Sequence, residues 1–166
     1  MDARQSKRGK RLSKRQEAEA ASDLGGRTMA ASGATRLGGG ADVRVMGQTR
    51  VECKVTEKDT YTIKVQELEK LRKQAIKSLE SPVFQFAFRY PTGKMTKYAI
   101  IPWHEGHGGQ QILLHTQAKQ YQVTERALEE KLYKGRIQLG FETRSFEILR
   151  WHDYIERMTI QPSKET

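Results

Sequence analysis

The chain has 166 residues, 36% of them hydrophobic, and a formal net charge of +10, which describes a basic chain the size of one domain. Its longest apolar runs, such as YAIIPW, are far too short to span a bilayer, and no apolar segment follows the basic start to make it a secretory signal. The single cysteine, Cys53, excludes an intramolecular disulfide and a cysteine metal cluster. We therefore expect an intracellular, cytoplasmic protein.

The positive charge is concentrated at the N-terminus, where residues 1–16 carry seven basic side chains against one acidic side chain, a local charge of +6. A basic arm on a nearly balanced body favours a polyanionic partner, and phosphate backbones are the commonest one. A solvated tail is the alternative. We treat residues 1–12 as a flexible arm. The basic residues expected to bind DNA phosphates are Lys7, Arg8, Lys10, Arg11, Lys14, Arg15, Arg27 and Arg36.

The first predicted element after the arm is a helix. Ser13 can cap it, the following Gln, Glu and Ala residues favour it, and Gly25–Gly26 would end it. A glycine-rich stretch then predicts a short extended piece and a loop. Two alternating, valine-rich segments follow at 41–46 and 50–55, and they predict two antiparallel strands joined by residues 47–49.

A second helix and a hairpin are predicted next. Residues 62–81 place apolar side chains at helical spacing, namely Val65, Leu68, Leu71, Ala75, Ile76 and Leu79. Residues 82–90 alternate strictly and turn at 91–94 into a partner strand. The alternation puts Phe84, Phe86 and Phe88 on one face, where core packing is favoured over base stacking or a dimer face.

The C-terminal third repeats this pattern. YTIKVQELEKLRKQ, from Tyr61, resembles YQVTERALEEKLYK, from Tyr121, and AIIPWHE resembles EILRWHD. Each unit predicts a strand, a helix and a hairpin ending in Trp-His-acid, and residues 106–120 between the units predict a loop and an edge strand. We therefore expect an α/β fold with a mixed central β-sheet flanked by helices, and a C-terminal strand–helix–hairpin extension.

Three charged side chains gather on the predicted hairpin of residues 41–55. Alternation directs Glu52 and Lys54 to one face and Cys53 to the other, toward the core. If residues 47–49 form a three-residue loop, Asp42 lies opposite Lys54 and diagonal to Glu52, roughly 7–8 Å from it at the backbone. A register slip of one residue would move Asp42 to the opposite face.

These residue types in this arrangement point to metal-dependent phosphodiester cleavage. Two neighbouring carboxylates repel each other unless a cation lies between them, and oxygen ligands suit Mg²⁺ or Mn²⁺. A lysine two residues from one ligand can orient a bound water or stabilise the charge that builds on a phosphate. The alternative is an exposed salt bridge between Asp42 and Lys54, with Glu52 merely solvated.

Residues 13–102 resemble the catalytic core of the PD-(D/E)xK nucleases, and within them the archaeal-type Holliday junction resolvases, which include versions carried by bacteriophages. The matching features are a helical glutamate in QEAEAASDLGG, the serine of AASGA, the aspartate of GGGADVRV and the Glu-x-Lys of RVECKV, with a helix after it. The resemblance implies a restriction-endonuclease-like fold. It divides the chain into a nuclease core at 13–103, an extension at 104–160 and a tail at 161–166.

The resemblance also implies a role for each matching residue. Asp42 and Glu52 would be metal ligands, and Cys53 would lend its backbone carbonyl to the same metal. Lys54 would be the catalytic lysine. Glu17 would be the additional acidic residue near the metal.

Two further positions follow from the same resemblance, and two departures from the pattern accompany them. Glu19 could substitute for Glu17, and Ser32 would lie near the scissile phosphate. The proline that gives the superfamily its name is replaced by Ala41, a loss that the family tolerates. The extension beyond residue 103 goes past the compact archaeal pattern.

Several other polar residues carry weaker signals. His104 and His107 lie among glycines at a spacing that matches no strong metal motif, and His152 beside Trp151 is interpreted as structural. Gln66 is either a helper at the active site or a solvated side chain. The glycines before Asp42 are not a phosphate-binding P-loop, because no Gly-Lys-Ser/Thr follows them.

The expected activity is paired hydrolysis of four-way DNA junctions with Mg²⁺, or Mn²⁺ in its place, leaving 5′-phosphate ends. Two cuts need two active sites, which a C2 homodimer supplies. If the chain is encoded by a phage, it would act in the cytoplasm of the bacterial host. Two alternatives stay open: another PD-(D/E)xK endonuclease of the nicking, flap or restriction-like kind, and a non-catalytic DNA-binding protein.

Overall fold

The fold is described from a computed structural model that covers residues 3–29, 42–105, 108–142 and 144–160. Ser32, Arg36 and His107 lie outside these residues. The backbone of residues 3–12 is described but their side chains are not, and four of the residues expected to bind DNA belong to this segment. That group comprises Lys7, Arg8, Lys10 and Arg11.

The described residues form four helices and ten strands. In chain order these are α1 (Ala3–Leu24), β1 (Arg27–Thr28), β2 (Val43–Val45), β3 (Thr49–Thr56), β4 (Thr60–Lys64), α2 (Val65–Lys77), β5 (Ser81–Arg89), β6 (Met95–Pro102), β7 (Gln111–His115), β8 (Gln120–Thr124), α3 (Glu125–Lys134), β9 (Arg136–Phe141), β10 (Arg144–Arg150) and α4 (Trp151–Ile160). None of these helices is both long enough and apolar enough to cross a membrane.

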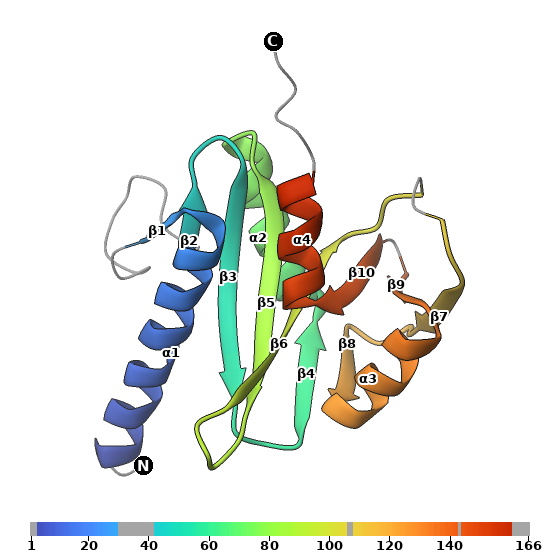
Figure 1. The fold of residues 1–166 in the computed structure, drawn as a ribbon. Helices are drawn as coiled ribbons and strands as arrows, with labels where there is room; N and C mark the ends of the chain where they lie inside the picture. The colour runs from blue at the N-terminus through green and yellow to red at the C-terminus, as the bar shows by residue number, and fades with distance from the viewer. Residues whose placement is uncertain (1–2, 30–41, 106–107, 143, 161–166) are drawn as a thin grey trace.

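The elements are arranged in layers around a mixed eight-stranded sheet of order β1-β2-β3-β5-β6-β10-β9-β7 (Figure 1). Helices α1 and α4 pack on one face, and the Trp151 indole of α4 donates to the Asp23 carboxylate of α1 at 2.8 Å. Helices α2 and α3 pack on the other face, together with a separate two-stranded ribbon of β4 and β8. This confirms the predicted α/β fold with a mixed sheet flanked by helices.

The sheet contains an internal repeat. The units β3-β4-α2-β5-β6 and β7-β8-α3-β9-β10 have the same order and the same pairings. The first strand pairs parallel with the third, which pairs antiparallel with the fourth. The two units meet where β6 pairs with β10, centred on Ile100 and Ile148, and where β4 pairs with β8, centred on Thr62 and Gln122. The two units are therefore related by a local two-fold axis. The repeated sequence predicted the duplication but not this symmetry.

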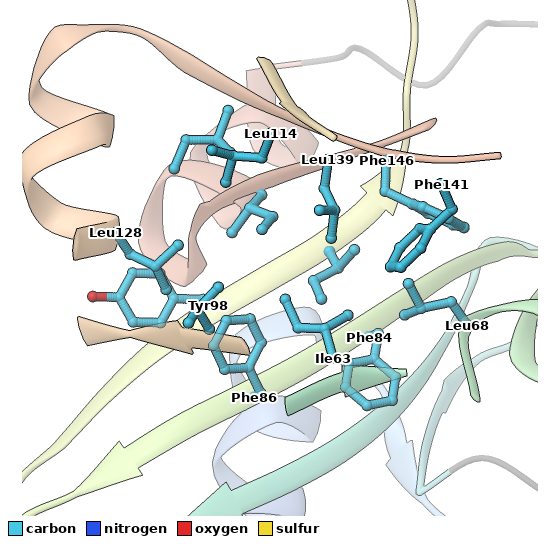
Figure 2. Packing of buried hydrophobic residues seen from close by; sticks show 14 of the residues in the cluster. Ile63, Leu68, Phe84, Phe86, Tyr98, Leu114, Leu128, Leu139, Phe141 and Phe146 are labelled. Atoms are coloured by element: carbon cyan, nitrogen blue, oxygen red, sulfur yellow. The ribbon is translucent and has the colours of Figure 1, made fainter. Parts of the chain in front are cut away.

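The larger core cluster lies between the sheet and the α2, α3 and ribbon layer (Figure 2). Phe84, Phe86 and Phe88 of β5 are at most 3% exposed, which confirms core packing and removes them as a base-stacking surface. Tyr61 of β4 stacks on Phe86, with ring centroids 4.8 Å apart. The smaller cluster lies under α1 and α4 and includes Cys53.

The first helix begins earlier than the sequence suggests. Helix α1 starts at Ala3 and not after Ser13, so the basic segment expected as a flexible arm forms its first turns. Arginine, lysine and leucine are good helix formers, and this preference outweighs the capping tendency of Ser13. The basic residues of this segment therefore belong to the helix that carries Glu17.

The second helix ends earlier than its apolar pattern suggests. Helix α2 stops at Lys77, and Leu79 adopts a left-handed conformation with φ of 55°. The Glu80 N–H then donates to the Ala75 carbonyl at 2.9 Å, which closes the helix end. Leu68, Leu71 and Ala75 are buried as predicted. Ile76, in the last turn of α2, and Leu79, beyond its end, are exposed.

The hairpin register differs by two residues from the predicted one. The turn consists of residues 46–48, with Gly47 at φ of 71°, and Thr49 belongs to β3. Val43 lies opposite Val51, so Asp42 lies opposite Glu52 and not Lys54. Because the shift is an even number of residues, Asp42 stays on the face that carries Glu52 and Lys54.

Candidate active site

Asp42 is fixed at the point where an edge of β3 becomes open. β2 pairs only with Thr49–Val51, and no described strand pairs with β3 on that side beyond Val51. The Asp42 N–H donates to the Val51 carbonyl at 2.9 Å, and its Oδ2 accepts from the Cys53 N–H at 2.7 Å. The carboxylate of Asp42 therefore caps the open edge of β3.

The carbonyl of Cys53 is directed to the same edge. In a strand the N–H and C=O of one residue point to the same side, and the Cys53 N–H points at Asp42. The thiol instead points out of the plane of the sheet, into the cluster beneath α1, and is buried. Burial, followed by the nearby Asp42 carboxylate, raises the pKa of the thiol well above its usual value, so the backbone oxygen is the available ligand and the sulfur is not.

Glu52 and Lys54 project from the opposite face of β3 as a pair. The Lys54 ammonium donates to Glu52 Oε1 at 2.6 Å, and both side chains remain partly exposed. Burial and the Asp42 charge raise the pKa of Glu52 despite the lysine. Burial alone would lower the pKa of Lys54, but its hydrogen bond to Glu52 prevails and the pKa is raised. The lysine is therefore fully charged at neutral pH.

Glu17 of α1 belongs to the same electrostatic group. Burial raises its pKa, and so do the charges of Asp42 and Glu52, whereas Lys14 and Lys54 oppose the rise. Its neighbour Glu19 faces elsewhere, because it accepts from Lys97 at 2.5 Å and from Arg15 at 2.8 Å. Of the two helical glutamates, Glu17 is thus the one that can reach the site.

A buried glutamine that sequence reasoning missed joins α1 to the site. Gln16 is 0% exposed and its amide donates at 2.9 Å to both the Lys54 carbonyl and Gln85 Oε1 of β5. It fixes the helix along β3 beside Glu17. The sequence signal was a polar residue one helical turn before the buried Ala20.

Two charged residues of α2 were missed as well. Glu67 raises the pKa of Lys54, and Lys70 counteracts the rise in the pKa of Glu52, so both lie within electrostatic reach. Gln66, the residue that sequence reasoning suggested, is exposed.

The other predicted residues are more dispersed. Lys14 is exposed close to Glu17, Arg15 is exposed and paired with Glu19, and Arg27 is exposed on β1. His104 is exposed, and His152 is exposed beside Asp153 at 2.9 Å. Among the predicted DNA-binding side chains within the described part of the chain, Lys14 is therefore the one beside the acidic group.

Buried carboxylates outside the site behave differently. Glu80 accepts from Arg44 at 2.5 Å and from Arg50 at 3.0 Å. Burial alone would raise the pKa of Glu80, but the two guanidinium groups hold it below its usual range. Glu80 is thus neutralised by two fixed cations, whereas burial and neighbouring carboxylates raise the pKa values of Glu17 and Glu52 even though Lys54 pairs with Glu52.

The donor set fits a cation held in part by water. In the portion of the chain that the structure describes, no group of three or more His, Cys, Asp and Glu side chains is close enough to enclose a metal ion. The oxygens that the register and the hydrogen bonds place at or beside the open edge of β3 are those of Asp42, Glu52 and the Cys53 carbonyl. Mg²⁺ commonly binds through one or two carboxylates and keeps several waters, so this set suits it.

Comparison with known proteins assigns no family to the chain: it matches no protein-family model and no curated protein sequence.

Proposed function

We propose that the protein is a Mg²⁺-dependent DNA endonuclease of the PD-(D/E)xK type that cleaves branched, four-way junctions. The observation that carries the proposal is the shared edge of β3, where Asp42 and Glu52 face each other and Lys54 stands beside them. The raised pKa values of Glu17 and Glu52 add to it. Burial is their first cause and the nearby carboxylates contribute, so a bound cation would stabilise the ionised forms.

The order of elements is consistent with this proposal. α1, β2 and β3 are followed by α2 and then by β5, which runs parallel to β3. This is the arrangement expected of a restriction-endonuclease-like core at residues 13–103. Asp42 comes at the start of the second strand and Glu-x-Lys in the third, as the resemblance to Holliday junction resolvases requires.

Each residue then has a role in hydrolysis. Asp42, Glu52 and the Cys53 carbonyl would hold the cation, and Glu17 would hold one of its waters. A bound Mg²⁺, or Mn²⁺ in its place, supplies Lewis acidity and lowers the pKa of a bound water. Lys54 would leave Glu52 when DNA binds, and would orient the attacking water or neutralise the phosphate.

The reaction is displacement at phosphorus by water. The new P–O bond forms on the side opposite the 3′-oxygen, the bond to that oxygen breaks, and the products are a 5′-phosphate and a 3′-hydroxyl. Basic residues of α1, with Arg27, Ser32 and Arg36, would contact the phosphates. The described part of one chain holds one such site, so paired cuts would require a C2 homodimer, which would act in the cytoplasm.

The test is cleavage of an end-labelled four-way junction by the purified chain, with and without Mg²⁺. Paired cuts at symmetric positions that need Mg²⁺ and Lys54 would support the proposal. Parallel reactions on a flap, a nicked duplex and a linear duplex separate a junction resolvase from other endonucleases of this type. DNA binding without any Mg²⁺-dependent product would leave a non-catalytic DNA-binding protein.

A further inference from the structure

The β4–β8 ribbon has one face in the core and one face in solvent. Alternate side chains point inward, and these include Tyr61 and Ile63 of β4. The outward side chains form three cross-strand pairs in the antiparallel register. They are Thr60, Thr62 and Lys64 of β4, opposite Thr124, Gln122 and Gln120 of β8.

This outer face carries hydroxyls, amides and positive charge, and no carboxylate. Lys64 and Lys119 lie at the same end, where the Val65 N–H donates to the Lys119 carbonyl at 3.0 Å. Both lysines are exposed, and neither forms an ion pair with any residue in the described ranges. Thr, Gln and Lys are side chains that commonly contact DNA phosphates and sugars.

The ribbon lies next to the candidate active site. Tyr61 stacks on Phe86, and Phe86 is the direct neighbour of Lys54 in the β3–β5 pairing. Burial raises the pKa of Tyr61, and the charges of Glu67 and Glu52 raise it further, so its hydroxyl lies within reach of the site. A substrate bound at Glu52 and Lys54 would therefore extend toward the ribbon.

The symmetry and width of the ribbon suit duplex DNA. Its pairing is centred on Thr62 and Gln122, the same local two-fold that relates the two repeat units. A duplex has two-fold axes across its grooves, and two-stranded ribbons are known to fit the major groove. Two paired strands lie about 4.8 Å apart, so a ribbon of this kind is narrow enough for a major groove about 12 Å wide.

We propose that the outer face of the β4–β8 ribbon binds duplex DNA, and that this contact positions an arm of the substrate over the edge of β3. The position over β3 rests on the proposed nuclease function. The DNA contact itself rests on the composition, charge and symmetry of the ribbon.

The test is a comparison of two charge-matched double variants of the full chain. The first double variant, Lys64→Glu with Lys119→Glu, changes the charge of the ribbon. The control, Lys73→Glu with Lys77→Glu, makes the same change in net charge on exposed lysines of α2, away from the ribbon. The affinity for a fluorescein-labelled duplex is measured by anisotropy over a range of salt concentrations without divalent metal. A third variant, Thr62→Ala with Gln122→Ala, removes ribbon contacts without any change in charge.

We expect the ribbon charge variant to bind at least tenfold more weakly than the α2 control, with the salt slope reduced by about two phosphate contacts. The uncharged variant should weaken binding severalfold and leave the salt slope unchanged. Equal affinities for the ribbon variants and the control would overturn the inference, and so would a wild-type chain that does not bind duplex. If the ribbon charge variant does not fold, the uncharged variant decides.

The outcomes also separate this inference from the proposed function. The ribbon variants could bind DNA as tightly as the control and still cleave junctions with Mg²⁺. That result would exclude the ribbon contact and support the nuclease. If DNA affinity depends on the ribbon but no cleavage product forms, the ribbon contact would be supported and the nuclease function would be excluded.

Discussion

The two units of the repeat share a topology and differ in what covers their outer strand. β3 of the first unit is flanked by β2 and covered by α1, and it carries Glu52 and Lys54. β7 of the second unit has no partner on its outer side among the described strands, and the positions equivalent to Glu52 and Lys54 are Ile112 and Leu114. Acidic and basic groups are therefore present where a neighbouring strand and helix complete a site, and apolar groups where they do not.

The difference separates what the fold needs from what the chemistry needs. Both units supply β-strands, a helix and apolar side chains to one continuous core (Figure 2). Beside the first unit alone, the preceding segment places Asp42 opposite β3 and Glu17 on α1. Within the described ranges, the second unit thus contributes to the shared sheet and core, and the one candidate catalytic centre lies at β3.

The largest expected effect tests whether the two units form one folding unit. Phe86 and Leu139 occupy equivalent positions and are both 0% exposed. Because each fills the shared core, Phe86→Ala should cost about 3–5 kcal/mol and Leu139→Ala about 2–5 kcal/mol. Urea unfolding should show a single transition in each case. A separate transition for the second unit in Leu139→Ala would break the comparison, and Leu79→Ala, at an exposed position, is the control.

The next largest effect is on the cleavage rate, and it tests whether only the first unit contributes to catalysis. Lys54→Ala should lower the rate of Mg²⁺-dependent cleavage by about 100- to 1,000-fold, because a charge that stabilises the transition state is lost. Ile112→Val alters the second unit at the position equivalent to Glu52 and should leave the rate unchanged. Both variants are measured under single-turnover conditions on the same labelled junction. An equal loss in both would show that the second unit contributes to catalysis.

Much of this arrangement could be predicted from the sequence, and the failures have physical causes. Strict alternation placed Phe86 in the core and Glu52 with Lys54 on one face, and the repeated segments predicted two similar units. The register was wrong by two residues because Gly47 takes the left-handed position at the centre of the turn, which leaves Thr49 to the strand.

Long-range pairing was harder to predict. The sequence showed that the segments beginning at Tyr61 and Tyr121 are similar. It did not show that residues 60–64 and 120–124 form strands that pair with each other away from the main sheet. Gln16 was likewise missed, since its partners, the Lys54 carbonyl and Gln85, are far away in the chain. Neither propensity nor periodicity contains information about such contacts, which depend on the packing of the two units.

A smaller effect on stability is expected from two carboxylates, one in the candidate site and one in the second unit. Glu147 is paired with Arg136 at 2.8 Å and Arg157 at 3.0 Å. Burial would raise its pKa, but these arginines lower it, so ionised Glu147 stabilises the fold above its ordinary value of 4.5. The pKa of Glu52 is raised instead, first by burial and then by Asp42, so ionised Glu52 destabilises the fold above 4.5.

Substitution by glutamine should therefore have opposite signs at neutral pH. Glu147→Gln should cost about 1–3 kcal/mol, and this cost should shrink as pH falls through the lowered pKa of Glu147. Glu52→Gln should raise the melting temperature slightly, and the gain should vanish below pH 4.5, where the carboxyl is protonated even in the unfolded chain. Thermal melts across this pH range provide the measurement. A stabilising Glu147→Gln would contradict the assignment.

The smallest expected effect is on the free energy of unfolding, and it depends on what covers the equivalent strands β3 and β7. Cys53 and Leu113 occupy equivalent positions on the face of the sheet that α1 covers in the first unit; Cys53 is 5% exposed there, whereas Leu113 is 63% exposed. Cys53→Ala should therefore cost about 1 kcal/mol, since it removes a buried group from beneath α1, whereas Leu113→Ala should change stability by less than about 0.5 kcal/mol. Both are measured by urea unfolding in the same buffer. A larger loss for Leu113→Ala would mean that another surface covers β7 in solution, and the second unit would then have a partner in place of the missing helix.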